Sequence, residues 1–384
     1  MKDLLDHLDR WEDANHRVVL ARVVGVDGSG PRDPGAAMAV NEAGEVIGSV
    51  SGGCVESAVV EAALELLAQG EDAGGKSCLK SFGYSDSDAF AVGLTCGGTV
   101  HLLLEELPTQ RSQPGSLFEV LFGEIRAGRP VALATTATSS YSPSESNKPQ
   151  RLLVRPKQDP IGDLGDENLN RVANRDALGR LESAKSETRH YGPHGEAGED
   201  AISVFFDSFA PKPRMLVFGA IDFSGALVRA AQLLGFYVMV CDARTVFATR
   251  QRFPTADELH VSWPDRLIDS IQANPDASPL GPNDAVCVLT HDPKFDVPAI
   301  QAALATNVGY IGVMGSRRTD ERRKQLLLEA GSSEKELEML HSPIGLDLGG
   351  RTPEEVAVSI LAEIVATRTG HGGVSLSDTT GPLH

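Results

Sequence analysis

The pattern of apolar and polar positions changes near residue 210. Beyond that point, short apolar runs of strand length alternate with longer stretches, which is typical of strands buried on both faces of a sheet. The runs occupy residues 215–219, 236–242, 257–263, 284–291 and 309–315. Because helical stretches separate these strands, the pattern predicts a parallel sheet with crossover helices.

The first 210 residues contain two segments of similar layout, opened by RVVLA at 17–21 and RPVALA at 129–134. In the first copy, strands are expected at 37–47 and 100–107 around a helix near 56–68. In the second copy, strands are expected at 152–156 and 202–209 around a helix near 168–181. The pattern indicates either an internal duplication, with copies at 17–107 and 129–209, or a chance likeness.

The polar character of two stretches, 135–150 and 182–200, predicts exposed loops. A third stretch, 208–214, contains Pro211 and Pro213 and predicts an extended linker. The domains are therefore expected at 1–210 and 211–384. The predicted fold class is α/β, with an N-terminal α/β domain followed by a Rossmann-like parallel sheet.

Composition limits the classes of partner. Lys and Arg number 35 against 53 Asp and Glu, and the formal net charge of -18 opposes binding to nucleic acid or to anionic membrane surfaces. No signal peptide or membrane-spanning run is recognisable, so a cytoplasmic protein is expected. The number and spacing of the cysteines predict free thiols, with neither a disulfide framework nor a metal site. They are Cys54, Cys78, Cys96, Cys241 and Cys287.

A glycine-rich turn, GSVSGGCVE at Gly48–Glu56, follows an expected strand and opens a helix. Unpaired amides and the positive end of the helix dipole favour an anion there, either a bound oxyanion or the thiolate of Cys54. A tight turn with a small buried thiol is the alternative. The candidate cofactor-binding residues of this turn are Ser51, Gly52, Gly53, Cys54 and Glu56.

A second glycine-rich turn, GLTCGG at Gly93–Gly98, leads into a strand and carries Cys96 at its centre. Two such turns in one domain predict a shared site, in which Cys54 and Cys96 lie close together at one cavity. Backbone amides, hydroxyls and two sulfurs would then face a large anionic ligand such as molybdopterin, which carries a phosphate and a dithiolene. The candidates from this turn are Thr95, Cys96 and Gly97.

In the C-terminal half, RMLVFGAIDFSG at residues 214–225 turns from a strand into a helix at Gly219. Asp242 follows about twenty residues later, as in dinucleotide-binding folds. Ile221 stands where the fingerprint has its second glycine, and Asp222 adds a negative charge. Both residues oppose a pyrophosphate, so NAD(P) is expected to bind weakly or not at all, with Asp222 left to hydrogen-bond a neutral group such as a pterin ring. A structural glycine and a solvated Asp242 are the alternative.

Ligands of open parallel sheets bind at the carboxyl ends of the strands. His291 follows the fourth expected strand, and Gly315, Ser316, Arg317 and Arg318 follow the fifth and open a helix. Two arginines at a helix N-terminus would suit a phosphate. The sites of the two domains are expected to face each other across a cleft; otherwise they act separately or across a homodimer.

Four segments together resemble the XdhC/CoxI family: the two glycine-rich turns, YIGVMGSRR at 310–318, and GLDLGGRTPEEVAVSILAEI at 345–364. They occur in the family's order and spacing across nearly the whole chain. The resemblance implies an accessory protein that binds molybdenum cofactor (molybdopterin) transiently and protects it while a cysteine desulfurase supplies the terminal sulfido ligand. It also implies delivery to an apo xanthine dehydrogenase or related hydroxylase, and a chaperone rather than a catalyst.

Two other functions are compatible with parts of the sequence. An NAD(P)-dependent oxidoreductase would use the C-terminal sheet for its cofactor and His291 or Asp292 for proton transfer, although Ile221 argues against it. A xanthine dehydrogenase itself would need clustered cysteines for iron-sulfur ligation, which five scattered cysteines do not supply.

Overall fold

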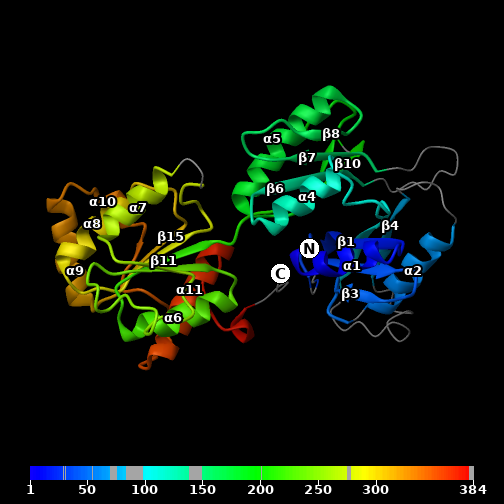
Figure 1. Ribbon diagram of the computed structural model, residues 1–384. Helices are drawn as coiled ribbons and strands as arrows, with labels where there is room; N and C mark the ends of the chain where they lie inside the picture. The colour runs from blue at the N-terminus through cyan, green and yellow to red at the C-terminus, as the bar shows by residue number, and fades with distance from the viewer. Residues whose placement is uncertain are drawn as a thin grey trace. The chain divides into compact units, whose positions relative to one another are not determined.

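The apolar runs beyond residue 210 form the parallel sheet that their alternation predicts (Figure 1). Its strands pair in parallel throughout, in the order β13-β12-β11-β14-β15-β16, which is the order of dinucleotide-binding sheets. The strands are β11 (Arg214–Phe218), β12 (Tyr237–Cys241), β13 (Glu258–His260), β14 (Ala285–Val288), β15 (Tyr310–Val313) and β16 (Leu340–His341). The α/β fold class with a Rossmann-like sheet is confirmed.

The computed structural model describes residues 1–28, 30, 32–53, 55–69, 76–83, 98–137, 149–199, 201–274 and 278–379. The chain forms two compact units, each with its own internal contacts. The first ends at Pro211 and the second begins at Lys212, inside the proline-containing segment at 208–214. The hydrophobic clusters of the two units share no residue. No helix in the described ranges has the length and apolar character that crossing a membrane requires.

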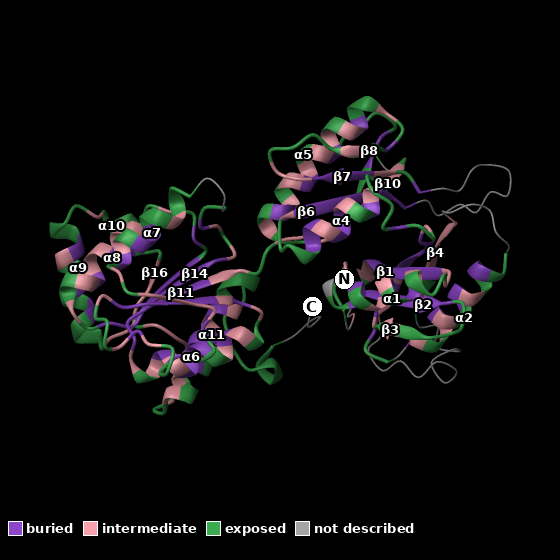
Figure 2. Ribbon diagram, in the orientation of Figure 1, coloured by how far each residue is buried: buried purple, intermediate pink, exposed green. Residues whose placement is uncertain are grey.

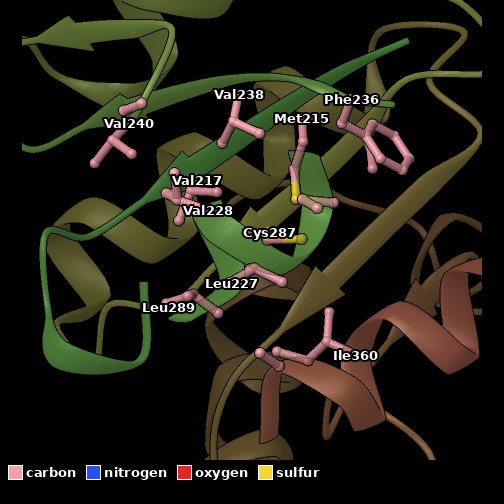
Figure 3. Close-up of a cluster of buried hydrophobic side chains, with 14 of the residues drawn as sticks. Met215, Val217, Leu227, Val228, Phe236, Val238, Val240, Cys287, Leu289 and Ile360 are labelled. Carbon is pink, nitrogen blue, oxygen red and sulfur yellow. The ribbon is translucent and has the colours of Figure 1, made fainter. Parts of the chain in front are cut away.

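Helices cover both faces of the parallel sheet (Figure 1). Met215 and Val217 of β11 pack with α6 and α11 (Figure 3), whereas Leu216 and Phe218 pack with α7 and α8. Burial on both faces explains why these strands are continuous apolar runs, coloured as buried in Figure 2. The helices are α6 (Asp222–Leu233), α7 (Pro264–Gln272), α8 (Pro293–Leu304), α9 (Arg317–Glu329), α10 (Glu334–Leu337) and α11 (Pro353–Thr369), followed by a 3-10 turn at Leu376–Asp378.

One expectation for this unit is wrong, and one strand is missed. Residues 243–257, between β12 and β13, form turns rather than the helical stretch expected between successive strands. The strand β16 is not expected at all, because a strand of two residues is too short to show a periodic pattern.

The N-terminal unit contains two antiparallel sheets with the same arrangement. The first has the order β3-β2-β1-β5-β4 and consists of β1 (Val18–Asp27), β2 (Ala37–Asn41), β3 (Val46–Gly48), β4 (Ser77–Phe82) and β5 (Thr99–Glu106). The second has the order β8-β7-β6-β10-β9 and consists of β6 (Val131–Thr136), β7 (Arg151–Val154), β8 (Ile161–Asp163), β9 (Glu187–Tyr191) and β10 (Ile202–Phe209). Corresponding strands occupy corresponding places, which supports the proposed duplication.

Helices extend the correspondence. After a 3-10 turn at Lys2–Leu4, α1 (Leu5–Asp13) precedes β1 as α4 (Leu117–Arg126) precedes β6. The third strand of each sheet is followed by α2 (Glu56–Ala68) or α5 (Glu167–Ser183), and each of these helices packs on its own sheet. The opposite faces of both sheets contribute to one shared cluster together with α1 and α4.

The sequence pattern misses several elements of this unit, namely α1, α4, β4, β8 and β9, and the run at 37–47 is the hairpin β2–β3. The strand β9 lies in the stretch 182–200, where an exposed loop is expected. Among the described strands it is an edge strand paired with β10, and it buries only Tyr191, so its polar sequence carries no alternating signal. Of the other expected loop, residues 138–148 lie outside the described residues.

The motif at 345–364 contributes mainly to the fold. Thr352 and Glu355 form a capping box at the start of α11, with Pro353 as its first helical residue. The Glu363 carboxylate accepts hydrogen bonds from the Tyr310 hydroxyl at 2.6 Å and from the Gly345 amide at 2.8 Å. These bonds connect β15, the loop before α11 and α11 itself.

Candidate functional site

The glycine-rich turn at 48–56 closes around the Glu56 carboxylate. This carboxylate accepts hydrogen bonds from the Ser49 hydroxyl at 2.7 Å, the Ser51 hydroxyl at 2.5 Å, and the amides of Ser51 and Gly53, both at 2.9 Å. Gly52 and Gly53 have positive φ angles of 78° and 120°, which this tight path requires. Two of the amides that could bind an external anion therefore already bind a carboxylate of the chain itself.

The donors around Glu56 also decide its protonation. Burial alone would raise its pKa, but hydrogen bonds from Ser51 and Ser49 outweigh burial and hold the pKa at about 2. Ser51 is 2% exposed, so its hydroxyl and amide are held in place by packing. The turn keeps an ionised carboxylate at the N-terminus of α2, where the helix dipole stabilises it.

Protonation of Glu56 is expected to destabilise the N-terminal unit in acid. The folded pKa of about 2 lies below the ordinary value of 4.5, so the stabilisation is complete above pH 4.5 and is lost as the pH falls toward 2. Unfolding of the Trp263→Phe protein with and without Glu56→Gln, followed by Trp11 fluorescence across this range, tests the assignment. The difference in stability between the two proteins should shrink as the pH falls, and a constant difference would contradict it.

The two cysteines proposed to share a cavity are not placed. Cys54, Thr95, Cys96 and Gly97 lie outside the described residues, so their proximity stays a prediction. Of the described cysteines, Cys78 is half-buried, and Cys241 and Cys287 are buried. No group of three or more His, Cys, Asp or Glu side chains in the described ranges is arranged to hold a metal ion.

A hydrogen-bonded chain that the sequence analysis misses lies where β1, β4 and β5 meet. The Ser81 hydroxyl lies 2.8 Å from Nδ1 of His101, and Nε2 of the same ring lies 2.9 Å from the Asp27 carboxylate. Antiparallel pairing places Ser81 opposite His101, two residues after the strand β5 begins. No sequence motif joins residues so far apart, and only the strand register brings them together.

In the C-terminal unit, the turn between β11 and α6 needs the glycine at 219. Gly219 has a φ of 105°, and a Cβ atom there would lie 2.8 Å from Thr290 Cγ2 and 3.1 Å from the Thr290 amide nitrogen. Its own amide donates to the Cys241 carbonyl at 2.9 Å. The turn therefore packs directly against the end of β14, as the Rossmann layout predicts.

Replacing Gly219 with alanine is expected to destabilise this unit by about 2 to 4 kcal/mol, because backbone strain and a close contact with Thr290 add together. Gly235→Ala is the matched control, since Gly235 has a φ of 83° but no atom within 4 Å of the added Cβ. This control should lower the free energy of unfolding by about 1 kcal/mol. Denaturant unfolding read by Trp263 in a Trp11→Phe background measures both. Equal losses would show that the contact with Thr290 is unimportant.

Asp242 lies at the end of β12 and is buried. Its carboxylate accepts the Ala220 amide at 2.9 Å and two guanidinium nitrogens of Arg244 at 2.9 and 2.8 Å. Burial would raise the pKa of Asp242, but the hydrogen bonds from Arg244 and Ala220 lower it overall. The alternative of a solvated Asp242 is therefore wrong.

The structure also corrects the argument from Asp222. Its side chain is 90% exposed at the first turn of α6 and pairs with Arg252 at 3.3 Å, rather than lying in a desolvated turn. Repulsion of a pyrophosphate by this carboxylate is thereby weakened, because a paired and solvated charge is screened. Ile221 is half-buried and packs against the hydrophobic cluster of α6 and α11.

The other candidates lie at the carboxyl edge of the same sheet, as expected. His291 is exposed after β14, and Ser316 caps α9 by accepting the Thr319 amide at 3.2 Å. Arg317 and Arg318 begin α9, are exposed, and form no ion pair with any described residue. Gly315 lies against Arg323, whose Nη2 would be 3.2 Å from an added Cβ.

Two buried residues that position this edge are missed by the sequence analysis. Asp296 of α8 binds the Thr290 hydroxyl and pairs with Arg323 of α9 at 3.2 Å. Arg323 also donates to the Met314 carbonyl at 2.8 Å. The network joins the loops after β14 and β15, which carry His291 and Arg317.

A cavity of about 430 Å³ lies between α5 and β9. Asp176 in its wall accepts hydrogen bonds from the Tyr191 hydroxyl at 2.8 Å and from Arg189 at 2.9 Å. These polar groups satisfy one another, and no residue proposed from the sequence lines the cavity.

The sequence of this chain is similar to those of known families and proteins. Residues 215–364 match the XdhC Rossmann domain, and residues 11–82 match the XdhC and CoxI family. A protein of Bacillus subtilis (strain 168) named as a probable subunit of xanthine dehydrogenase is 28% identical over 361 residues, which are 94% of this chain and 96% of that protein. The molybdenum cofactor insertion chaperone PaoD of Escherichia coli (strain K12) is 28% identical over 351 residues, covering 91% of this chain and 83% of PaoD.

A solved structure shares the fold. The crystal structure of a xanthine dehydrogenase from Bacillus halodurans aligns with a TM-score of 0.65 and 22% identity, over 98% of this chain and 97% of that one. At this level of identity the likeness shows the arrangement of elements alone.

Proposed function

Because the chain belongs to the XdhC/CoxI family, we propose that it binds molybdenum cofactor and inserts it into a xanthine dehydrogenase-type hydroxylase. The observation that carries the proposal is the similarity to a molybdenum cofactor insertion chaperone over most of both chains. The cofactor is cargo in this role, held while a cysteine desulfurase acts on it and then released to the apo-enzyme.

The described residues fit the phosphate of such a ligand. Arg317 and Arg318 offer two exposed guanidinium groups at the N-terminus of α9, a helix of 13 residues, where the dipole adds to their attraction for an anion. They lie at the carboxyl edge of a parallel sheet, the usual ligand position in this fold. The turns at 48–56 and 93–98 stay the predicted ligand site of the N-terminal unit.

The alternative is an NAD(P)-dependent oxidoreductase, and the strand order of the parallel sheet is the observation that favours it. Against it, the Asp242 carboxylate is occupied by Arg244 and Ala220, so it is not free to accept a ribose hydroxyl. Titration with NAD(H) and NADP(H), with turnover of the nicotinamide as readout, distinguishes an oxidoreductase from a chaperone.

The test is purification without oxygen from a host that makes molybdenum cofactor, followed by measurement of molybdenum and pterin. Near-stoichiometric molybdopterin is expected, and the loaded protein should activate an apo-hydroxylase. The same chain from a host unable to make molybdopterin is the control. Pterin no higher than in this control would refute the proposal, as would loaded protein that activates no apo-hydroxylase.

A further inference from the structure

The loop after β12 contains an arginine that the function proposed above does not use. Arg244 binds Asp242 through its amide and Nε to Oδ1, both at 2.9 Å, and through Nη2 to Oδ2 at 2.8 Å. Oδ2 also accepts the Ala220 amide. Four N–H groups therefore converge on a carboxylate whose side chain is 2% exposed.

The same contacts hold the Arg244 guanidinium in one orientation. Its side chain is 46% exposed, and its central carbon lies 4.3 Å from the centroid of the Phe247 ring. Arg252 lies 5.4 Å from the same ring and donates to the Ala220 carbonyl at 2.9 Å. Among the described residues, Nη1 of Arg244 has no hydrogen-bond partner, so a fixed cationic group faces solvent at the end of β12.

In dinucleotide-binding sheets, the acidic residue at this position accepts the ribose hydroxyls, and a nearby arginine accommodates a phosphate on the ribose instead. Here the acid is buried and saturated, and the arginine is exposed. We propose that Arg244 binds a phosphomonoester dianion, so that a ligand at this edge presents a phosphate and not a free ribose diol to β12. The phosphate could belong to molybdopterin, in which case the inference rests on the proposed function, or to the 2′ position of a nucleotide.

The neighbouring charges permit an anion here. Asp222 pairs with Arg252 at 3.3 Å, and Asp292 pairs with Lys294 at 3.0 Å. Asp242 is likewise paired, with Arg244. Arg317 and Arg318 form no ion pair with any described residue, so two unpaired cations lie at the same edge in a chain whose formal net charge is -18.

The first arm of the test compares NADP⁺ with NAD⁺ by calorimetry on the full chain. A charge-assisted bond to the extra phosphate should make NADP⁺ bind roughly tenfold to a hundredfold more tightly. Arg244→Gln should remove the preference. Because this variant leaves Asp242 unpaired, the neutral pair Asp242→Asn with Arg244→Gln is made as well, and circular dichroism checks that both fold. Arg368→Gln, which removes an exposed arginine at the end of α11, should change nothing.

The second arm measures the molybdopterin retained by the same variants after expression in a cofactor-producing host. Loss of pterin in both Arg244 variants, without any nucleotide preference, would assign the phosphate to molybdopterin. A preference for NADP⁺ that both variants abolish would assign it to a nucleotide, even if the wild-type chain carries no pterin and the proposed function fails. Equal binding of NAD⁺ and NADP⁺, or no binding of either, together with unchanged pterin retention would overturn the inference.

Discussion

Arg323→Leu is expected to lower the free energy of unfolding of the C-terminal unit by about 3 to 5 kcal/mol, because it leaves a buried carboxylate without its cation. The side chains of Arg323 and Asp296 are 4% and 3% exposed. Burial holds the pKa of Asp296 above its ordinary value even though Thr290 and Arg323 act against it. Without Arg323, Asp296 would have to take up a proton or draw in water, and the Met314 carbonyl would also lose its donor.

Arg322→Leu is the matched control, since Arg322 is the exposed neighbour on the same helix. The control should change stability by less than about 0.5 kcal/mol. Unfolding in denaturant, read by Trp263 in a Trp11→Phe background, isolates the C-terminal unit. Losses of similar size in the two variants would mean that the buried pair contributes no more than a surface arginine.

Arg22→Leu is expected to have an effect of the same size on the N-terminal unit. Arg22 pairs with Glu105 at 2.7 Å and with Asp207 at 3.3 Å, and all three side chains are at most 2% exposed. Burial keeps the pKa of Asp207 raised despite Arg22. Leucine would leave Asp207 without a cation, although Glu105 would keep its second partner, Arg151. The expected loss is about 3 to 5 kcal/mol.

Arg126→Leu provides the comparison, because Arg126 pairs with Asp9 at the surface, with side chains 43% and 47% exposed. An exposed pair contributes about 0 to 1 kcal/mol. Trp11 fluorescence in a Trp263→Phe background reports the N-terminal unit. Adding Asp207→Asn to Arg22→Leu should recover part of the loss, since the unpaired charge disappears. No recovery would indicate that lost packing, rather than lost charge pairing, causes the effect.

These buried ion pairs bear on function because they hold in place the loops that carry the candidate residues. The Asp296–Arg323 pair holds together the ends of β14 and β15, from which His291, Arg317 and Arg318 project. The Arg22 network joins the two antiparallel sheets of the N-terminal unit, one of which leads into the turn around Glu56. Binding measurements on the Arg323 and Arg22 variants are therefore best made where circular dichroism shows that the chain is folded.

Much of the C-terminal fold is predictable from the sequence. Strands such as β11 bury both faces, so the four positions after Arg214 are all apolar and the run stands out against the polar helices around it. Edge strands give no such signal: β9 reads ETRHY and β16 has two residues. Helix α1 is likewise missed, although three of its nine residues are buried in the core shared by both sheets.

The candidate site is predictable in its position more than in its chemistry. The glycine positions at 52, 53 and 219 and the residues after β14 and β15 are located correctly as turns and strand ends, because glycine and helix-capping residues act locally. Asp222 and Asp242 show the limit. From the sequence alone, Asp222 is expected to repel a ligand, and a solvated Asp242 stays possible. In the structure, Arg252 pairs with Asp222 and screens its charge, whereas Asp242 is buried and paired with Arg244.

The amino-acid sequence by itself determined the parallel sheet, the turn glycines and the family, since each depends on residues close together in the chain or on motifs in order. Only the tertiary structure decided which charge meets which. Arg22 pairs with Glu105, 83 positions away in the sequence, and with Asp207, 185 positions away. Amides of the turn at 48–56 donate hydrogen bonds to the carboxylate of Glu56 in the same turn. Periodicity reports the face on which a side chain lies, and the packing of one sheet on another selects its partner.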